Sequence, residues 1–141
     1  MSTKFQVTFD CQDPHVLADF WAAALGYDVE SFENLIGRLQ KDGHLPASEV
    51  VDHAGRPCFR IACACLDPDG VRSRLLFQIV PEGKSVKNRV HLDLNVGHAN
   101  IPQTVERLIT LGATKLWAAG EPGQEHCLTL ADPEGNEFCV Q

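Results

Sequence analysis

The chain has 141 residues, of which 44% are hydrophobic and 22% are charged, which suits one globular domain. Its formal net charge of −7 argues against nucleic acid as a partner, because phosphate backbones are bound by basic surfaces. No apolar stretch is long enough to span a bilayer, and the N-terminus lacks the apolar region of a secretory signal. We therefore expect a cytoplasmic protein with no membrane partner.

The six cysteines contain no C-x-x-C pair, so the sequence does not predict a structural zinc site, and in the cytoplasm their thiols should be reduced. Cys63 and Cys65 stand two apart on a predicted strand and share one face of it. Packing in the core is the favoured interpretation of this pair, and soft-metal binding is the alternative.

The first half of the chain is predicted to form a strand, a helix and three further strands. Residues 5–11 alternate as a strand does, and Asp13-Pro14 is typical of a helix start. The helix ends at Gly26 and carries one apolar stripe, made of Val16, Leu17, Phe20, Trp21, Ala24 and Leu25. Three extended segments follow, at 27–32, 59–66 and 75–80, with an Asp-Pro-Asp-Gly turn at 67–70.

The second half repeats this order. A strand is predicted at 89–96, and Asn100 opens a helix that ends at Gly112. The apolar face of this helix is expected to contain Ile101, Val105, Leu108, Ile109 and Leu111. Extended segments follow at 113–117, 126–131 and 137–140, with an Asp-Pro-Glu-Gly turn at 132–135.

The repeat predicts an α+β fold in which two βαβββ modules form a curved mixed sheet around a central cleft, with the helices outside. Both modules, at about 4–81 and about 88–141, belong to one domain. The first module has an insertion, with helical spacing over 32–43 and a loop over 44–57 that includes a strand fragment at 49–52. We expect it to cover one end of the cleft, and its apolar residues to contribute to a homodimer.

Polar side chains alternate along the first strand of each module. Gln6, Thr8 and Asp10 share one face of the first, and His91, Asp93 and Asn95 share one face of the second. A polar inner face is typical of ligand binding, so these residues are predicted to bind a small molecule. The alternative is a solvated face or a polar network that satisfies itself.

His91 and Asp93 are the predicted catalytic residues, because a carboxylate beside an imidazole forms an acid/base pair, with Asp10 as the alternative carboxylate. The alternative for His91 is a buried ring bonded to a backbone carbonyl. Arg89 leads into this strand and would recognise an anion, unless it is part of a solvated linker. Cys139 is a ligand-binding candidate and, next to His91, a candidate nucleophile. The alternative is that it is a small packing residue. The other histidines are expected at the surface or in loops, namely His15, His44, His53, His98 and His126.

Three phrases carry a resemblance to a known superfamily: FDCQDPHVLADFWAAALGY (9–27), RLLFQIVPEGKSVKNRVHLDL (74–94) and LTLADPEGNEFCV (128–140). Together with the repeat, they resemble the vicinal oxygen chelate superfamily, and within it the small bacterial glyoxalase-like domain proteins. The resemblance implies a divalent metal bound by inward-facing side chains on the first and last strand of each module. In this chain those positions are Gln6, Gln78, His91 and Cys139.

This implied ligand set contains no carboxylate, and a hard cation is held weakly without one. We therefore predict no bound cofactor, with a divalent metal on Gln6, Gln78 and His91 as the alternative. A strand register shifted by two residues would replace Cys139 by Glu137 and restore a carboxylate.

The resulting functional prediction is a glyoxalase-like small-molecule-binding protein with a degenerate metal site, acting in metabolite binding or resistance. The alternative is an enzyme, either a divalent-metal-dependent lyase, isomerase or dioxygenase type, or a metal-free acid/base catalyst that uses His91. A third hypothesis is an interaction module whose cleft is vestigial.

Overall fold

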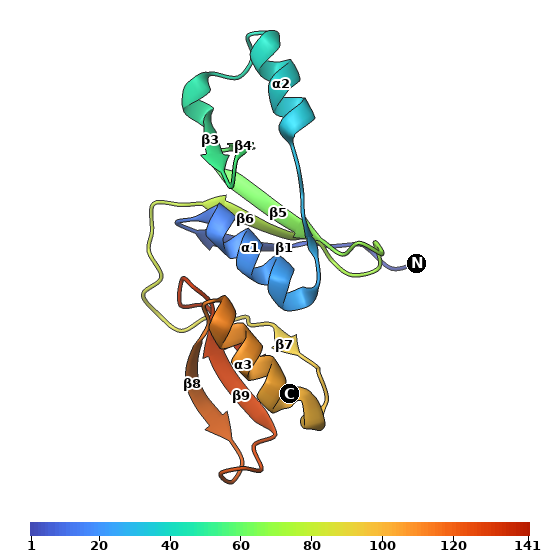
Figure 1. Ribbon diagram of the computed structural model, residues 1–141, viewed down its shortest axis with the longest axis vertical. Helices are drawn as coiled ribbons and strands as arrows, with labels where there is room; N and C mark the ends of the chain where they lie inside the picture. Colours follow the sequence, from blue (N-terminus) through green and yellow to red (C-terminus); the bar gives the residue numbers. More distant parts are fainter. The chain divides into compact units, whose positions relative to one another are not determined.

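The computed structural model describes all 141 residues and divides into two compact units, 1–82 and 83–141, called module one and module two below (Figure 1). Module one contains β1 (Val7–Cys11), α1 (Pro14–Leu25), β2 (Asp28–Val29), α2 (Glu33–Lys41), β3 (Val50–His53), β4 (Arg56–Phe59), β5 (Ala62–Leu66) and β6 (Leu75–Ile79). Module two contains β7 (Asp93–Leu94), α3 (Ile101–Leu111), β8 (Thr114–Ala119), β9 (Cys127–Ala131) and β10 (Glu137–Val140). Short 3₁₀ turns precede β3, at Ala47–Glu49, and α3, at His98–Asn100.

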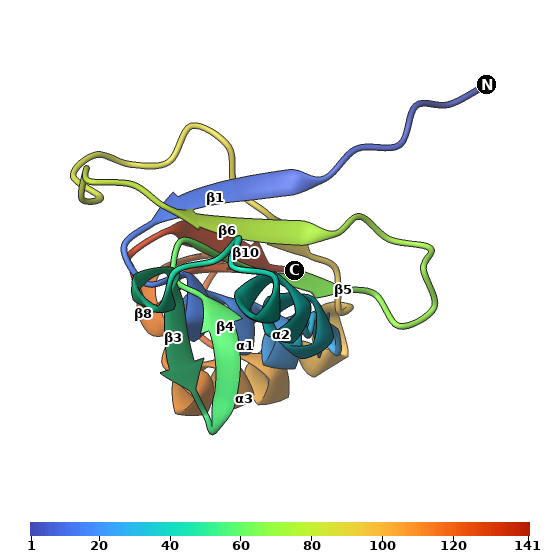
Figure 2. The same cartoon turned by 90° about the horizontal axis from the view of Figure 1, so that it is seen from above.

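Each module has a four-stranded sheet with the same topology. The strand orders are β1-β6-β5-β2 and β7-β10-β9-β8, so the first strand lies beside the last in both modules. That pair is parallel, and the other pairs are antiparallel. Figure 2 shows β1 and β6 side by side. The predicted α+β class and βαβββ order are confirmed, whereas the predicted central cleft concerns both modules together and stays a prediction.

The core of module one lies between its sheet and α1, which packs against β5 and β6. Asp13 caps this helix by accepting hydrogen bonds from the backbone N–H groups of residues 15 and 16, and Gly26, with φ of 71°, ends it. Trp21 and Phe77 are fully buried in this core. Val16 was wrongly predicted on the buried stripe, because its side chain is 41% exposed.

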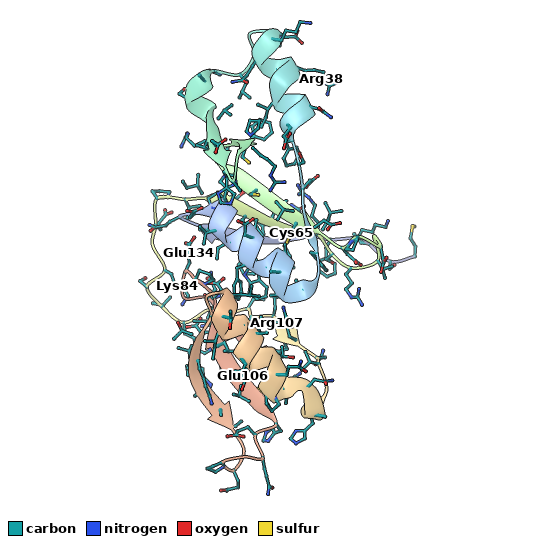
Figure 3. The ribbon with its side chains drawn as sticks, in the orientation of Figure 1. Arg38, Cys65, Lys84, Glu106, Arg107 and Glu134 are labelled. Atoms are coloured by element: carbon teal, nitrogen blue, oxygen red, sulfur yellow. The ribbon has the colours of Figure 1, made fainter.

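Cys63 and Cys65 pack in the same core, as predicted. Cys65, labelled in Figure 3, has no exposed surface, and both side chains lie on the sheet face that α1 covers. Burial raises the pKa of the Cys63 thiol to about 11 and that of Cys65 to about 12. All six cysteines are free thiols, and these two serve as small apolar packing residues.

The core of module two lies between α3 and the strands β9 and β10. The helix buries Ile101, Val105 and Leu108, which repeat at helical spacing. Ile109 and Leu111 were wrongly assigned to this face, because they are 45% and 38% exposed. The buried stripe of α3 is therefore narrower than its apolar composition suggests.

The two Asp-Pro-acid-Gly tetrapeptides form tight turns, as predicted. The Asp67 carboxylate accepts hydrogen bonds from the backbone N–H groups of residues 69, 71 and 72, and Asp67 is buried, with 3% of its surface exposed. Asp132 does the same for the N–H groups of residues 134 and 136. Gly70 and Gly135 adopt φ of 67° and 89°, which favours glycine at the end of each turn.

The insertion in module one is more ordered than the predicted loop. The predicted helix is confirmed as α2, with Ile36 buried, and β3 and β4 then pair as a hairpin in a sheet of their own. The segment 59–66 was wrongly predicted as one strand, because β4 ends at Phe59 in the hairpin and β5 begins at Ala62 in the main sheet. β4 and β5 are separate strands because they form backbone hydrogen bonds in different sheets, and residue alternation does not show which strands pair.

The strand predicted at 89–96 is regular only at Asp93–Leu94, and the segment predicted at 27–32 only at Asp28–Val29. The backbone still follows β10 beyond β7, since the N–H of Cys139 donates to Leu92 O and the N–H of Val96 donates to Gln141 O. None of the helices is long and apolar enough to cross a bilayer.

Candidate functional site

The face of the module two sheet that α3 does not cover carries several polar side chains, beside Trp117, which lies opposite Thr129 and is 50% exposed. Asp93 lies opposite Cys139 across the parallel pair, and Cys139 lies opposite Thr129 across the next pair. Because side chains alternate along strands, the neighbouring Leu94, Phe138 and Val140 turn to the other face and are buried. The strand register therefore gathers polar side chains from β7, β9 and β10 on one surface.

His91, Asp93 and Cys139 form the centre of this surface. One ligating atom from each, an imidazole nitrogen, a carboxylate oxygen and a thiol sulfur, lies within 4.8 Å of the others. His91 Nδ1 lies 3.1 Å from Asp93 Oδ1, and the two side chains are 37% and 43% exposed. The structure thus brings together the two predicted catalytic residues and one predicted ligand-binding residue, and all three are reachable by a small molecule.

Two further residues border this cluster and were not predicted. Thr129 Oγ1 lies 3.5 Å from Cys139 Sγ. Burial, together with the hydrogen bond to Cys139 and the charge of Asp93, raises the pKa of the Cys127 thiol to about 11. Cys127 is therefore a neutral thiol near pH 7. Its position two residues before Thr129, on the same strand face, was the available sequence signal.

The other predicted residues of module two are Arg89 and Asn95. Arg89 is exposed before β7. The amide of Asn95 accepts a hydrogen bond from Gln141 Nε2 at 3.0 Å. The assignment of Arg89 and Asn95 to ligand binding stays a prediction.

The equivalent face of module one carries a different set of polar contacts. Asp10 lies opposite Gln78, and Gln78 Nε2 donates to Asp10 Oδ1 at 2.9 Å, while Thr8 is exposed on the same strand. Gln6 Oε1 accepts from Arg74, whose guanidinium also forms an ion pair of 2.6 Å with Glu30. The two glutamines that the resemblance places as metal ligands are therefore engaged in hydrogen bonds within module one.

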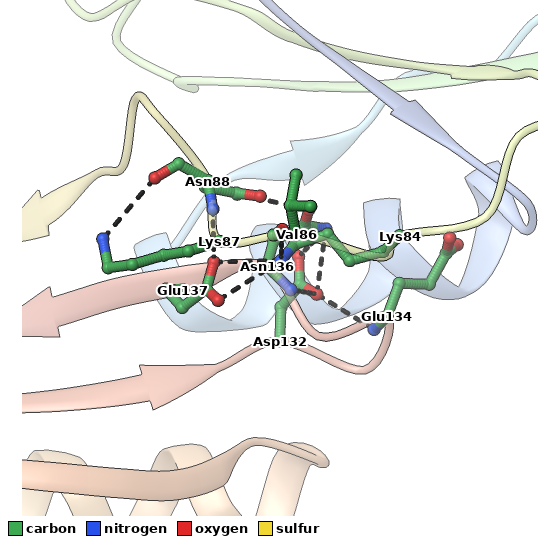
Figure 4. A network of polar contacts seen from close by, with 8 residues as sticks. All are labelled: Lys84, Val86, Lys87, Asn88, Asp132, Glu134, Asn136 and Glu137. Carbon is green, nitrogen blue, oxygen red and sulfur yellow. Dashed lines mark hydrogen bonds and ion pairs between the residues drawn. The ribbon is translucent and has the colours of Figure 1, made fainter.

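Glu137 belongs to a separate network in module two (Figure 4). Its carboxylate accepts from Lys84 Nζ at 3.2 Å and from the backbone N–H of Asn88 at 2.9 Å. Asn88 also donates to Asn136, which binds the buried carboxylate of Asp132. Glu137 ties the segment before β7 to β10. The ligand set implied by the resemblance contained no carboxylate. The cluster of His91, Asp93 and Cys139 does contain one, that of Asp93.

The Glu137 network predicts a pH dependence of stability. Burial alone would raise the pKa of Glu137, but the Asn88 N–H bond and the Lys84 ammonium together hold that pKa below its ordinary value. A carboxyl whose pKa is lower in the folded state stabilises the fold above its unfolded pKa, and that contribution disappears as the pH falls through the folded pKa.

We therefore expect Glu137→Gln to unfold at lower urea concentration than the wild type at pH 7, with the difference shrinking below pH 4. Urea titrations between pH 3 and pH 7 measure this. The exposed Glu121→Gln serves as the control for loss of one negative charge. A constant difference across the whole range would contradict the linkage.

The cluster's donor chemistry fits some divalent metals better than others. Donor atoms around a tetrahedral zinc lie about 3.3–3.8 Å apart, and the ligating atoms of His91, Asp93 and Cys139 lie within 4.8 Å of one another, so the widest pair would need to close by about 1 Å. A mixed set of nitrogen, oxygen and sulfur suits a borderline cation such as Zn²⁺ rather than a hard one. The residues therefore fit a zinc-type ion with an open position for a ligand oxygen.

The predicted exposure of one histidine in module one was wrong. His15 was predicted at the surface or in a loop, but it is only 6% exposed. It stacks on His53, with ring centroids 5.1 Å apart, and His53 Nε2 lies 2.7 Å from Asp19 Oδ2. The Asp13-Pro14 start placed His15 in the first turn of α1, but sequence periodicity does not show that the hairpin covers this turn.

The sequence model of the glyoxalase-like domain family matches residues 6–141. No curated protein sequence matches the chain. Among solved structures, it resembles a glyoxalase/bleomycin resistance protein/dioxygenase family enzyme from Burkholderia phytofirmans PsJN, at 16% identity over 96% of this chain and 94% of the other, with a TM-score of 0.62.

It also resembles the fosfomycin resistance protein FosX from Mesorhizobium loti, at 13% identity over 100% of this chain and 91% of the other, with a TM-score of 0.65. A mutant FosX from Listeria monocytogenes, in complex with Mn(II) and 1S,2S-dihydroxypropylphosphonic acid, matches at 10% identity over 100% of this chain and 90% of the other, with a TM-score of 0.61. These identities support a shared fold. The family match over nearly the whole chain shows that the protein belongs to the glyoxalase-like domain family.

Proposed function

We propose that the protein binds a small polar molecule on the open sheet face of module two, at His91, Asp93 and Cys139. The observation that carries this proposal is the close approach of these three side chains while His91 and Asp93 stay partly exposed. A polar cluster that faces solvent, beside strands whose other face is buried, has the composition of a ligand site.

The pairing of His91 with Asp93 sets the chemistry offered to a ligand. The carboxylate of Asp93 favours a proton on Nδ1, 3.1 Å away, so Nε2 of the neutral ring is an acceptor. Nε2 would accept a hydrogen bond from a ligand hydroxyl and, if the ligand is reactive, its proton. The ligand class that fits best is a small hydroxylated molecule, with an anionic group attracted by the exposed guanidinium of Arg89.

Nuclear magnetic resonance of protein with ¹⁵N-labelled histidines tests this proposal against a panel of short hydroxy acids and phosphonates. We expect at least one compound to shift the His91 ring nitrogens saturably. In calorimetric titrations, which need no His91 signal, His91→Ala and Asp93→Asn should each weaken that binding by about threefold to tenfold, the effect of losing or misorienting one hydrogen bond between uncharged groups. His98→Ala, an exposed histidine of the same module, is the matched control. Equal binding by all variants would refute the proposal.

A second candidate is a divalent-metal-dependent enzyme of the lyase, isomerase or dioxygenase type. The observation that favours it is the fit of the same three donor atoms to a zinc-type ion. A bound cation would polarise a ligand oxygen, while Asp93 would act as a ligand instead of orienting the His91 ring.

Elemental analysis of protein purified without chelator, followed by titration with Zn²⁺ and Mn²⁺, separates the two candidates. The metal-dependent candidate predicts near-stoichiometric metal, a preference for Zn²⁺, and loss of binding in Cys139→Ser. Binding should also release protons, because the thiol must ionise. Metal-free protein that binds a hydroxy acid at His91 would contradict this candidate and support the first.

A further inference from the structure

Trp117 extends the polar cluster of module two across the whole sheet. The strand register forms one row of four side chains, one from each strand, namely Asp93, Cys139, Thr129 and Trp117. Directly paired residues point to the same face of a sheet, so the indole shares a face with the carboxylate and the thiol. Trp117 is 50% exposed, whereas Trp21, the other tryptophan, is 1% exposed in the core of module one. The fold therefore leaves half of the Trp117 surface open.

A β-bulge in β8 turns Trp117 to this face. Lys115 pairs with Leu130, so in a regular ladder the next residue, Leu116, would pair with Thr129. The register instead shifts by one residue, and Trp117 pairs with Thr129. Without the extra residue the indole would point to the face that α3 covers, where Leu130 is fully buried. β-Bulges redirect side chains in this way and are frequent next to active sites.

The interval between the indole and the polar cluster suits one small molecule. Neighbouring strands lie about 4.8 Å apart, so the three intervals from β8 to β7 separate Trp117 from Asp93 by about 14 Å along the row. The two side chains between them are short, and Thr129 is only 7% exposed, as expected of a small side chain with a larger neighbour. The long indole and imidazole side chains shorten the interval from both ends. A hydroxyl group joined to a ring by a few bonds fits the distance that remains.

We propose that Trp117 binds the ring of an aromatic hydroxy acid whose hydroxyl group hydrogen-bonds to His91 Nε2, an inference that rests on the function proposed above and names its ligand class. The indole supplies a rigid apolar surface on which an aromatic ring stacks. A small ligand fits this surface better than a protein partner, because the centres of protein interfaces are depleted of charged residues and Asp93, 43% exposed, lies in the same row. The alternative occupant is a second copy of the chain, which the measurements below distinguish.

Lactate and 3-phenyllactate test the proposal on the unmodified protein, because they share the hydroxy acid and only the second has a ring. We expect phenyllactate to shift the His91 ring nitrogens saturably and to bind at least about tenfold more tightly than lactate. It should also change the tryptophan fluorescence of the wild type but not that of Trp117→Phe, in which Trp21 is the one remaining indole. Equal affinities would refute this inference and leave the proposed function intact. No shift with either compound would also refute it, whereas the proposed function fails only if the whole panel of hydroxy acids and phosphonates is inert.

Three variants test the same contact from the protein side. Trp117→Ala should reduce the affinity for phenyllactate to that for lactate, whereas Trp117→Phe keeps an aromatic ring and should retain most of the preference. Ile109→Ala, which removes a 45% exposed apolar side chain from α3, is the matched control and should leave the preference unchanged. A preference that survives in Trp117→Ala would refute the assignment. Sedimentation that shows a ligand-free dimer, lost in Trp117→Ala, would show that a second copy covers the indole and would refute it as well.

Discussion

Replacing Phe77 by alanine is expected to lower the free energy of unfolding by about 3–5 kcal/mol, a large share of the 5–15 kcal/mol typical of a whole domain. Phe77 has no exposed surface, and its ring centroid lies 5.2 Å from that of Phe9. It occupies β6, between β1 and β5, so the cavity would open at the centre of the module one core. Close packing leaves the neighbouring side chains little room to fill it.

Urea unfolding followed by far-ultraviolet circular dichroism and tryptophan fluorescence measures this effect. Phe5→Ala is the matched control, because the same side chain is 72% exposed there and its removal should change stability by less than about 0.5 kcal/mol. Similar losses in the two variants would contradict the assignment of Phe77 to the core.

Replacing Asp132 by alanine should cost about 2–4 kcal/mol. Its carboxylate, which is 3% exposed, accepts from the backbone N–H groups of Glu134 and Asn136 and from the side-chain amide of Asn136. These donors would lose their acceptor while remaining in a tight buried turn. Asn136 also binds Asn88, so the segment that leads into β7 should loosen as well.

Hydrogen exchange distinguishes this effect from a general loss of stability. We expect the amides of Asn88 and Asn136 to exchange faster in Asp132→Ala than global unfolding accounts for. Asp69→Ala changes the exposed acid in the corresponding turn of module one and should leave exchange in module two unaltered. Uniform protection around Asn88 in both variants would show that the turn does not hold this segment.

The two modules place different chemistry at corresponding points of one topology. In each sheet the first and last strands are parallel, and an aspartate of the first strand faces a polar residue of the last. In module one the pair is Asp10 and Gln78, which bond to each other, whereas in module two it is Asp93 and Cys139, with His91 beside them. At these corresponding sheet positions, only module two has residues that can exchange protons near neutral pH or bind a borderline cation.

The sequence by itself determined the α+β class, the repeated βαβββ order, both helix starts and both Asp-Pro turns. These features depend on local signals, namely alternation, helical spacing, capping by Asp13 and glycines at positive φ such as Gly135. It also placed His91 and Asp93 on one strand face, because residues two apart on a strand point the same way.

Only the tertiary structure decided which side chains meet across strands. The register of β10 against β7 and β9 brought Cys139 to Asp93 and Thr129, and the Lys84 and Asn88 contacts assigned Glu137 to a different network. The hairpin folded over α1 likewise buried His15. Such contacts depend on ladder pairing between distant segments, and a one-residue change in register turns every side chain to the other face, so periodicity within one segment does not determine them.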